Sequence, residues 1–380
     1  MTTKSRGLFM NIKKLAAALA ASVIAVTAVT VTAFAAGTKV PITEKYFPDE
    51  NFREYVSQFD TDGNGYLSQK ERDAVTEIDV GYDSRAFYER GEIRSLKGIQ
   101  YFIGLKKLNC AGNKIAGLDI SGNTKLEYLD CGANELTALD VSNNLELKTL
   151  CCYYNVLTDI DVSKNTELTE LMCSRNRLTS VDISTNVALE YLECEDNELT
   201  ELNTENNIAL AKLYCNGNRI KSIDTSKNPE LVTLKCGGNN LKVLDVSNNL
   251  KLESLVCLGN DLASIDVRAN TALEYFSCGE NKLTELNVSK NAKLGWLECE
   301  GNELVKLDLR KNPKLRTLEC SGNKLKSLNL TKCAELEYLY CSNNEFKSID
   351  VSKNQKLISY DIDDGVKVTG KLPFMSIECD

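Results

Sequence analysis

The chain has 380 residues, a net charge of −9, fifteen cysteines and no histidine. The absence of histidine excludes Ser-His and Cys-His nucleophile pairs and histidine-ligated metal sites. So acidic a chain also lacks the basic footprint that nucleic acids and anionic membranes require, and we expect neither as a partner.

Residues 1–36 have the pattern of an export signal. Lys13 and Lys14 precede an apolar run over 15–34, and Ala33-Phe34-Ala35 places small residues at a cleavage site. The run is also long enough for a retained membrane anchor, but its Ala and Thr content and the cleavage pattern favour removal. We therefore expect a secreted protein, or one associated with the cell surface, with no membrane insertion after cleavage. Loss of the four basic residues of this segment leaves a net charge of about −13.

Residues 37–80 carry the sharpest chemical motif, which has the spacing of a calcium-binding EF-hand loop. Its ligand positions are Asp60, Asp62, Asn64, Tyr66 (through its carbonyl), Ser68 and Glu71. Ca²⁺ takes six to eight oxygens, and Gly65 at the sixth position allows the positive φ with which such a loop wraps the ion. The flanking stretches 50–59 and 69–76 predict helices, the first with Phe52, Tyr55, Val56 and Phe59 on one face.

An Asp/Asn/Gly turn without an ion is the alternative interpretation of this loop. EF-hand loops usually pair, and this chain has one. We therefore expect structural Ca²⁺ in an EF-hand-like helical cap over the open end of the segment that follows. Val75, Ile78 and Val80 predict the first strand of that segment, and 81–91 predicts a protruding loop.

Residues 105–356 consist of one 21-residue unit, LxxLxCxxNxLxxLDVSxNxx, written twelve times. Apolar residues at positions 1, 4, 6, 11, 14 and 16 predict a short strand followed by a return segment. Burying six such side chains is worth on the order of 10 kcal/mol, and fixing 21 backbones costs at least as much. One unit is therefore unstable alone, and the units must stack into a solenoid with a parallel sheet along one side.

The solenoid extends over 75–362, with a last strand at Leu357, Tyr360 and Ile362 and a C-terminal cap at 363–380. Asparagines at position 9 (Asn113 to Asn344) and position 19 (Asn123 to Asn354, with Cys333 as the exception) are expected to form buried ladders that satisfy backbone groups at the two turns.

Twelve cysteines fall at position 6, where parallel neighbours place their Cβ atoms about 4.8 Å apart, too far for the roughly 3.8 Å of a disulfide. We interpret them as a column of small core side chains. The three other cysteines lie off this column: Cys151 is predicted to face outward and be reactive, and a bridge between Cys333 and Cys379 is conceivable.

This pattern resembles bacterial leucine-rich repeat proteins of the internalin type. The resemblance covers about 75–362, and Ile93, Leu96, Ile99, Phe102 and Leu105 are similar to the internalin spacing of the first turns, without its leading Asn. It implies a curved right-handed superhelix of the α/β type, mainly parallel β with short non-β return segments. It is specific for the fold and only weakly so for function, because such scaffolds carry many different partners.

Positions 3, 5, 7 and 8 of each unit line the strand side, which is usually concave and binds partners. The aromatic residues there are the expected partner-binding set: Tyr128, Tyr153, Tyr154, Tyr191, Tyr214, Tyr275, Trp296, Tyr338 and Tyr340. Met172 and several acids stand among them, and for any single residue the strand preference of tyrosine is explanation enough. For the whole face we predict that a monomer binds an extracellular protein.

A glycan-binding module that stacks sugars on the same aromatic residues is the alternative, and the acidic residues favour a basic protein surface instead. An enzyme is the third hypothesis, because Glu298 and Glu319 beside Trp296 have the residue types of a glycosidase pair. An open sheet face offers no pocket that excludes water, so we expect no enzymatic activity.

Overall fold

The computed structural model describes residues 38–82 and 91–372. The expected export signal, most of the expected loop at 81–91 and the residues from 373 onward, including Cys379, lie outside these ranges. Within the described ranges no helix is long and apolar enough to span a membrane.

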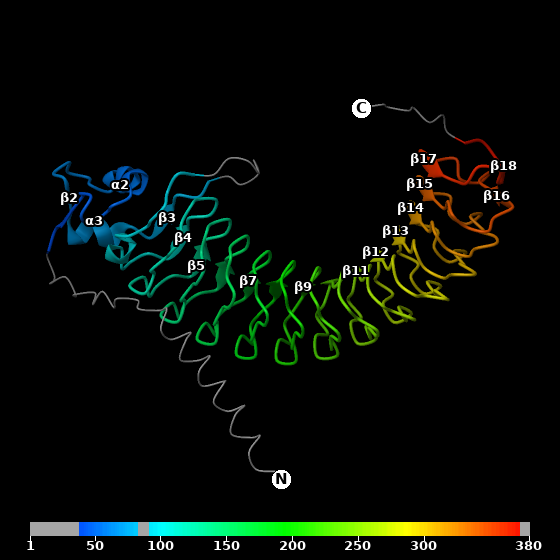
Figure 1. The fold of residues 1–380 in the computed structure, drawn as a ribbon, viewed down its shortest axis with the longest axis horizontal. Coiled ribbons are helices and arrows are strands. Elements are labelled where there is room, and N and C mark those ends of the chain that lie inside the picture. The colour runs from blue at the N-terminus through cyan, green and yellow to red at the C-terminus, as the bar shows by residue number, and fades with distance from the viewer. Residues whose placement is uncertain (1–37, 83–90, 373–380) are drawn as a thin grey trace, which may run out of the picture. The chain divides into compact units, whose positions relative to one another are not determined.

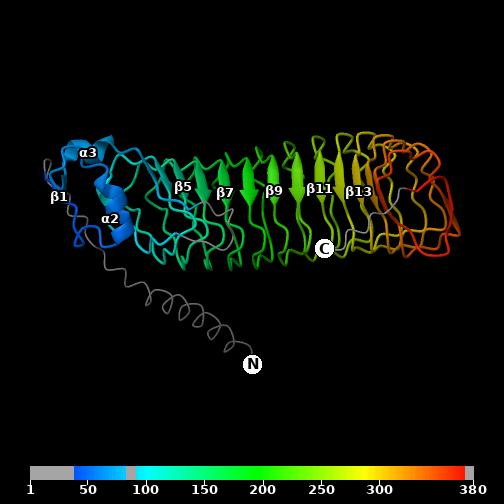
Figure 2. The same cartoon turned by 90° about the horizontal axis from the view of Figure 1, so that it is seen from above.

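A parallel sheet of fourteen strands runs through residues 77–361 in the order of the sequence. Each strand is three residues long and pairs in register with the strand one repeat away, so that Leu234 lies beside Leu213 and Leu255. The strands lie on the inner side of the curved ribbon (Figure 1) and are seen side by side in Figure 2. The strands are β3 (Glu77–Asp79), β4 (Lys107–Asn109), β5 (Tyr128–Asp130), β6 (Thr149–Cys151), β7 (Glu170–Met172), β8 (Tyr191–Glu193), β9 (Lys212–Tyr214), β10 (Thr233–Lys235), β11 (Ser254–Val256), β12 (Tyr275–Ser277), β13 (Trp296–Glu298), β14 (Thr317–Glu319), β15 (Tyr338–Tyr340) and β17 (Ser359–Asp361).

The core is one continuous apolar column built from the six predicted positions of each repeat. In the repeat that starts at Leu231, the side chains of Leu231, Leu234, Cys236, Leu241 and Val246 are at most 1 % exposed. The return segments carry turns and no strand over most of the chain. This is the leucine-rich repeat solenoid that the sequence predicts, and each coil buries its apolar side chains against its two neighbours.

The asparagine at position 9 is buried and joins three backbone segments, as predicted. The Nδ2 of Asn239 lies 2.9 Å from the carbonyl oxygen of Cys215 and 3.1 Å from that of Cys236. Its Oδ1 accepts a hydrogen bond from the amide of Ile220 at 3.0 Å. The amide thus pairs backbone groups that the inward turn would otherwise leave unsatisfied.

The position-19 asparagines donate to two carbonyls in the same manner, but the acceptor oxygen of most of them has no partner within the described ranges. Two of them are satisfied by threonine, because Thr204 and Thr225 donate their hydroxyls to Asn228 and Asn249, both at 2.8 Å. Cys333 replaces one asparagine and is fully buried.

The fourteen cysteines of the described residues are all free thiols. The twelve at position 6 are almost fully buried and form the predicted column. Cys151 faces the strand side, as predicted, but the prediction that it is reactive is wrong, because its side chain is only 4 % exposed. The longer side chains of Tyr128, Tyr153 and Met172 stand around it, and its sulfur lies 3.9 Å from that of Met172. Burial, then the nearby carboxylates, raise the pKa of Cys151 and keep it a thiol.

The N-terminal segment folds as two short helices joined by the Asp60–Glu71 loop. The helices α2 (Glu50–Ser57) and α3 (Gln69–Ala74) end about two residues earlier than predicted, and β1 (Val40–Pro41) pairs antiparallel with β2 (Tyr66–Leu67). Phe52 and Val56 on α2 are fully buried.

Aromatic rings and one carboxylate hold this segment on the first coils. Phe59 and Phe47 pack against Phe102, with centroids 5.6 and 6.4 Å apart. Asp49 caps α2 through Phe52 at 3.0 Å and also accepts a hydrogen bond from the amide of Arg94 at 2.7 Å. A short 3₁₀ helix, η1 (Ile99–Tyr101), completes this contact.

The last described residues, 363–372, depart from the 21-residue repeat. Here β18 (Lys367–Thr369) pairs in parallel with β16 (Ser348–Asp350) on the return side. The last described residues therefore continue the hydrogen bonding of the coil that they follow.

Candidate functional site

The strand face carries all nine aromatic residues that the sequence predicts for partner binding. Strand alternation points positions 3 and 5 away from the core, and these nine side chains are half-buried or exposed. Tyr154 and Trp296 are the most open, at 38 % and 40 % exposure. The structure divides them into a group on β5–β9 and a group on β12–β15.

Position 8 of every repeat has a left-handed backbone, which the sequence analysis missed. Six repeats place glycine there, with φ between 60° and 70°. Five others place Ala133, Tyr154, Arg175, Asp196 and Glu280 at φ between 50° and 56°, and the last uses Asn343. An L-residue in this conformation costs roughly 1–2 kcal/mol. The bulky side chains at four of these sites are therefore held on the strand face against a backbone penalty.

The aromatic rings on β6–β9 are covered by the protein's own cations. The guanidinium of Arg175 lies 4.6 Å from the ring centroid of Tyr154, and the ammonium of Lys235 lies 4.2 Å from that of Tyr214. Lys212 approaches Tyr191 at 5.6 Å. These cation–π contacts orient the rings and supply local positive charge.

The acids of this first group are also engaged within the face. The hydroxyl of Tyr191 donates to Glu193 at 2.6 Å, and Glu195 accepts from Asn216 at 2.7 Å. Arg175 forms an ion pair with Asp196 at 3.2 Å. Burial is the main cause that raises the pKa of Glu195, and the charge of Glu193 adds to it.

The second group is built around Trp296, whose ring stands beside Tyr275 at 5.8 Å between centroids. Both rings are tied to one carboxylate: Nε1 of Trp296 donates to Glu298 at 2.7 Å, and the hydroxyl of Tyr275 donates to the other oxygen at 3.0 Å. Burial, and then Glu298, raise the pKa of Tyr275 to about 12. Glu298 therefore fixes an aromatic platform and has both oxygens engaged in doing so.

A shallow hollow of about 430 Å³ lies beside this platform. Trp296 and Tyr338 line it together with Thr317, and Gly295 lacks the side chain that would fill it. Arg316 at its rim is bound to Glu337, with N–O distances of 2.9 Å. The hollow can accept a side chain or a sugar ring between two aromatic walls.

The Asp60–Glu71 loop brings three of its predicted metal ligands together. Carboxylate oxygens of Asp60, Asp62 and Glu71 lie within 4.8 Å of one another. Asn64 accepts a hydrogen bond from the amide of Tyr66 at 3.0 Å, so its side chain caps the turn. Tyr66 itself lies in β2 and presents its carbonyl at the seventh position of the loop.

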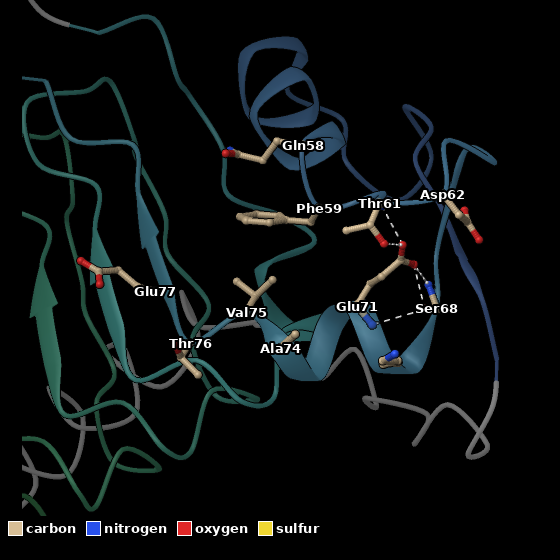
Figure 3. Close-up of a pocket in the computed structure, with 11 residues that line it drawn as sticks. Gln58, Phe59, Thr61, Asp62, Ser68, Glu71, Ala74, Val75, Thr76 and Glu77 are labelled. Carbon is tan, nitrogen blue, oxygen red and sulfur yellow. Dashed lines mark hydrogen bonds between the residues drawn. The ribbon is translucent and has the colours of Figure 1, made fainter.

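Glu71 is held in place by donors from both ends of the loop (Figure 3). One oxygen accepts from the amide and hydroxyl of Thr61, both at 2.7 Å, and the other from those of Ser68, both at 2.8 Å. These bonds, led by the Ser68 amide, lower the pKa of Glu71 to about 2. Glu71 and Ser68 also form the capping box of α3, so donors of the loop itself fix this carboxylate. A cavity of about 590 Å³ adjoins Glu71 and extends to Phe59 and Val75.

Comparison with known proteins supports the fold over most of the chain. The family model described as "Leucine Rich repeats (2 copies)" matches residues 313–354. None of the curated proteins matches the chain. Among solved structures, an internalin (InlF) from Listeria monocytogenes aligns with a TM-score of 0.78 at 22% identity, covering 86% of this chain and 98% of its own. A leucine-rich repeat protein from Leptospira interrogans aligns with a TM-score of 0.66 at 22% identity, covering 78% and 86%. These two likenesses establish the fold.

The functional domain of InlJ from Listeria monocytogenes, described as including a cysteine ladder, is more similar in sequence. It is 35% identical, with a TM-score of 0.81, and the alignment covers 90% of this chain and 74% of that domain. At this identity and coverage, the chain belongs to the internalin family of leucine-rich repeat proteins.

Proposed function

We propose that this protein is a binding scaffold, secreted or held at the cell surface, that recognises an extracellular protein through its strand face. The observation that carries this proposal is the left-handed backbone at Tyr154, Arg175, Asp196 and Glu280. The fold places glycine at the equivalent position of six repeats, so the bulky residues are retained for their surface side chains and not for folding. Aromatic residues on a rigid sheet are the usual anchors of protein interfaces.

A glycan ligand is the second candidate, and the hollow beside Trp296 is the observation that favours it. Trp296 and Tyr338 bound a space of about 430 Å³, which suits a sugar ring between aromatic faces. The wide spacing of the two aromatic groups, on β6 and β13 among others, favours a large protein partner instead.

The test is binding of residues 37–380 to one array that carries both extracellular proteins and glycans. Variants Tyr154→Ala and Trp296→Ala probe the two groups, and Val243→Ala, which is 73 % exposed on the return side, is the matched control. We expect a protein hit that is weakened about 30-fold or more by either face variant and is unchanged by the control. Hits on glycans alone would select the second candidate. Hits that tolerate both face variants would exclude the strand face.

We further propose that the Asp60–Glu71 loop binds a structural calcium ion. The support is the convergence of three carboxylates within 4.8 Å and the positive φ of Gly63 and Gly65. Asp60, Asp62, Asn64, Ser68, Glu71 and the Tyr66 carbonyl would supply the hard oxygen ligands that Ca²⁺ takes. Bound there, the ion would neutralise the clustered carboxylates and link α2 to α3.

Calorimetry of residues 37–380 with CaCl₂ tests this site, with Glu71→Gln as the variant and Glu77→Gln as a control at an exposed acid nearby. We expect saturable binding at or below about 1 mM, the range of extracellular modules, and a higher unfolding temperature with calcium. Glu71→Gln should abolish both effects. Absence of binding heat and of any thermal shift at millimolar calcium would refute the proposal.

A further inference from the structure

Four glutamates form an acidic cluster, defined as Glu280, Glu298, Glu300 and Glu319, next to the Tyr275–Trp296 platform. They occupy positions 5, 7 and 8 of three consecutive repeats on the strand face. The carboxylate of Glu300 occupies the space over Gly279 that a side chain there would fill, and that of Glu280 does the same over Gly301. The glycines thus let these carboxylates lean across the neighbouring coil.

No described lysine or arginine forms an ion pair with any member of the acidic cluster. The first aromatic group differs, because Arg175, Lys212 and Lys235 cover its rings. Arg175 also forms an ion pair with Asp196. Over Tyr275 and Trp296, no cation of the described residues takes that place. The second group therefore repeats the aromatic and acidic parts of the first without cations over its rings. Lys293 and Arg316 line the hollow beside it, and Arg316 is bound to Glu337.

Two polar atoms at this cluster are buried without a partner in the described part of the chain. The hydroxyl of Ser277 lies on the same face, in β12 directly beside Glu298 of β13, and its side chain is 0 % exposed. One oxygen of Glu300 is likewise shielded from solvent and accepts no hydrogen bond. A buried acceptor without a donor is costly. Burial, together with the charges of Glu298, Glu319 and Glu280, raises the pKa of Glu300.

The shape of the cluster selects the kind of cation. Within the described residues, the group of three carboxylates whose oxygens lie within 4.8 Å of one another is the one at Asp60. The acidic cluster is more open than a metal site requires. A guanidinium offers five donors in a plane and stacks on aromatic rings, which matches spaced carboxylates beside a flat platform.

We propose that the acidic cluster and the Tyr275–Trp296 platform form a binding surface for an arginine side chain presented by the protein partner. Glu300 and Glu319 accept its hydrogen bonds, Trp296 stacks on its plane, and Glu298 acts as a positioning residue that holds the two rings. This proposal rests on the proposed function, because it names the chemistry of the partner at one part of the same face. It adds a requirement for a basic, planar anchor.

Trp296 is the only tryptophan in the chain, so its fluorescence reports directly on this surface. We would titrate residues 37–380 with tetra-arginine amide at low salt, and with tetra-lysine amide, tetraglutamate and CaCl₂ as comparisons. Glu300→Gln and Glu319→Gln are the test variants. Glu285→Gln is the matched control, because it removes the same charge from an exposed site on the return side.

We expect a saturable change with tetra-arginine, a weaker one with tetra-lysine and none with tetraglutamate. Glu300→Gln and Glu319→Gln should each weaken arginine binding about tenfold or more, and Glu285→Gln less than about twofold. If all three variants lose the same affinity for tetra-arginine, the peptide responds only to the net charge of the protein. That result would overturn the proposal. A saturable fluorescence change with CaCl₂ that is lost in the same variants would show that the cluster binds a metal ion, and would overturn the arginine proposal.

The outcome is separable from that of the proposed function. Lack of any fluorescence change with either cationic peptide up to about 10 mM would mean that binding is too weak to matter. That result would refute the proposed arginine site. A protein partner found on the array that still requires Tyr154 would leave the binding scaffold in place.

Discussion

Replacing Glu280 with glycine separates the stability of the scaffold from the chemistry of its surface. The backbone of Glu280 has φ 50°, a conformation that costs an L-residue roughly 1–2 kcal/mol. The greater freedom of glycine in the unfolded chain returns about 0.5–1 kcal/mol of this. We therefore expect Glu280→Gly to raise the free energy of unfolding by about 0.5–1 kcal/mol, and loss of one carboxylate next to Glu300 acts in the same direction.

Urea denaturation followed by circular dichroism measures this change. Gly322→Ala is the reverse control, because its φ is 64° and a new Cβ would meet neighbouring atoms only at 3.5 Å and beyond. That variant should lose about 1 kcal/mol through backbone conformation alone. A Glu280→Gly protein less stable than the native one, beside an unaffected Gly322→Ala, would refute the idea that position 8 is strained. In the fluorescence titration, Glu280→Gly should weaken arginine binding.

Asn239→Ala should lower the free energy of unfolding by about 2–4 kcal/mol, because the backbone amide and carbonyl groups that Asn239 pairs become buried without partners. The control is Asn248→Ala, at an exposed site in the same repeat, which should change this free energy little. Urea titration measures both variants. Thr225→Val should cost about 1 kcal/mol by the same assay through loss of the 2.8 Å bond to Asn249, and no cost would show that the position-19 oxygen needs no donor. Because its folded-state pKa is raised, Glu300 contributes stability that is fully present below its unfolded pKa of about 4.3 and is lost as the pH rises through the folded value. Glu300→Gln should therefore raise the thermal unfolding midpoint at pH 7 more than at pH 4, and a shift independent of pH would contradict the assignment.

The repeat made the solenoid predictable, because each apolar position recurs every 21 residues and only stacking can bury it. Leu234 and Asn239 illustrate this: their roles follow from the strand period and from hydrogen-bond supply. The left-handed position was hidden, since Tyr154 and Glu280 alternate there with glycines and no single residue type marks the site. A scan for the column in which glycine recurs would have found it.

The burial of Cys151 was unpredictable for a different reason. Alternation correctly placed its side chain on the strand face, but exposure depends on the size of side chains on the two adjacent strands, about one repeat away in sequence. Tyr128 and Met172 close over a small thiol. The bond from Tyr275 to Glu298 is also a contact between two strands, which the repeat period does not predict.

The in-register pairing of the sheet has a consequence for how such a face can change. Adding or deleting one whole repeat between β6 and β13 would move Tyr154 relative to Trp296 by one strand spacing, about 4.8 Å, with each aromatic group left intact. The distance between the two aromatic groups on this scaffold is therefore adjustable only in fixed steps. A partner of the kind proposed, with contact points spaced differently, would be matched by a change in repeat number, without redesign of either group.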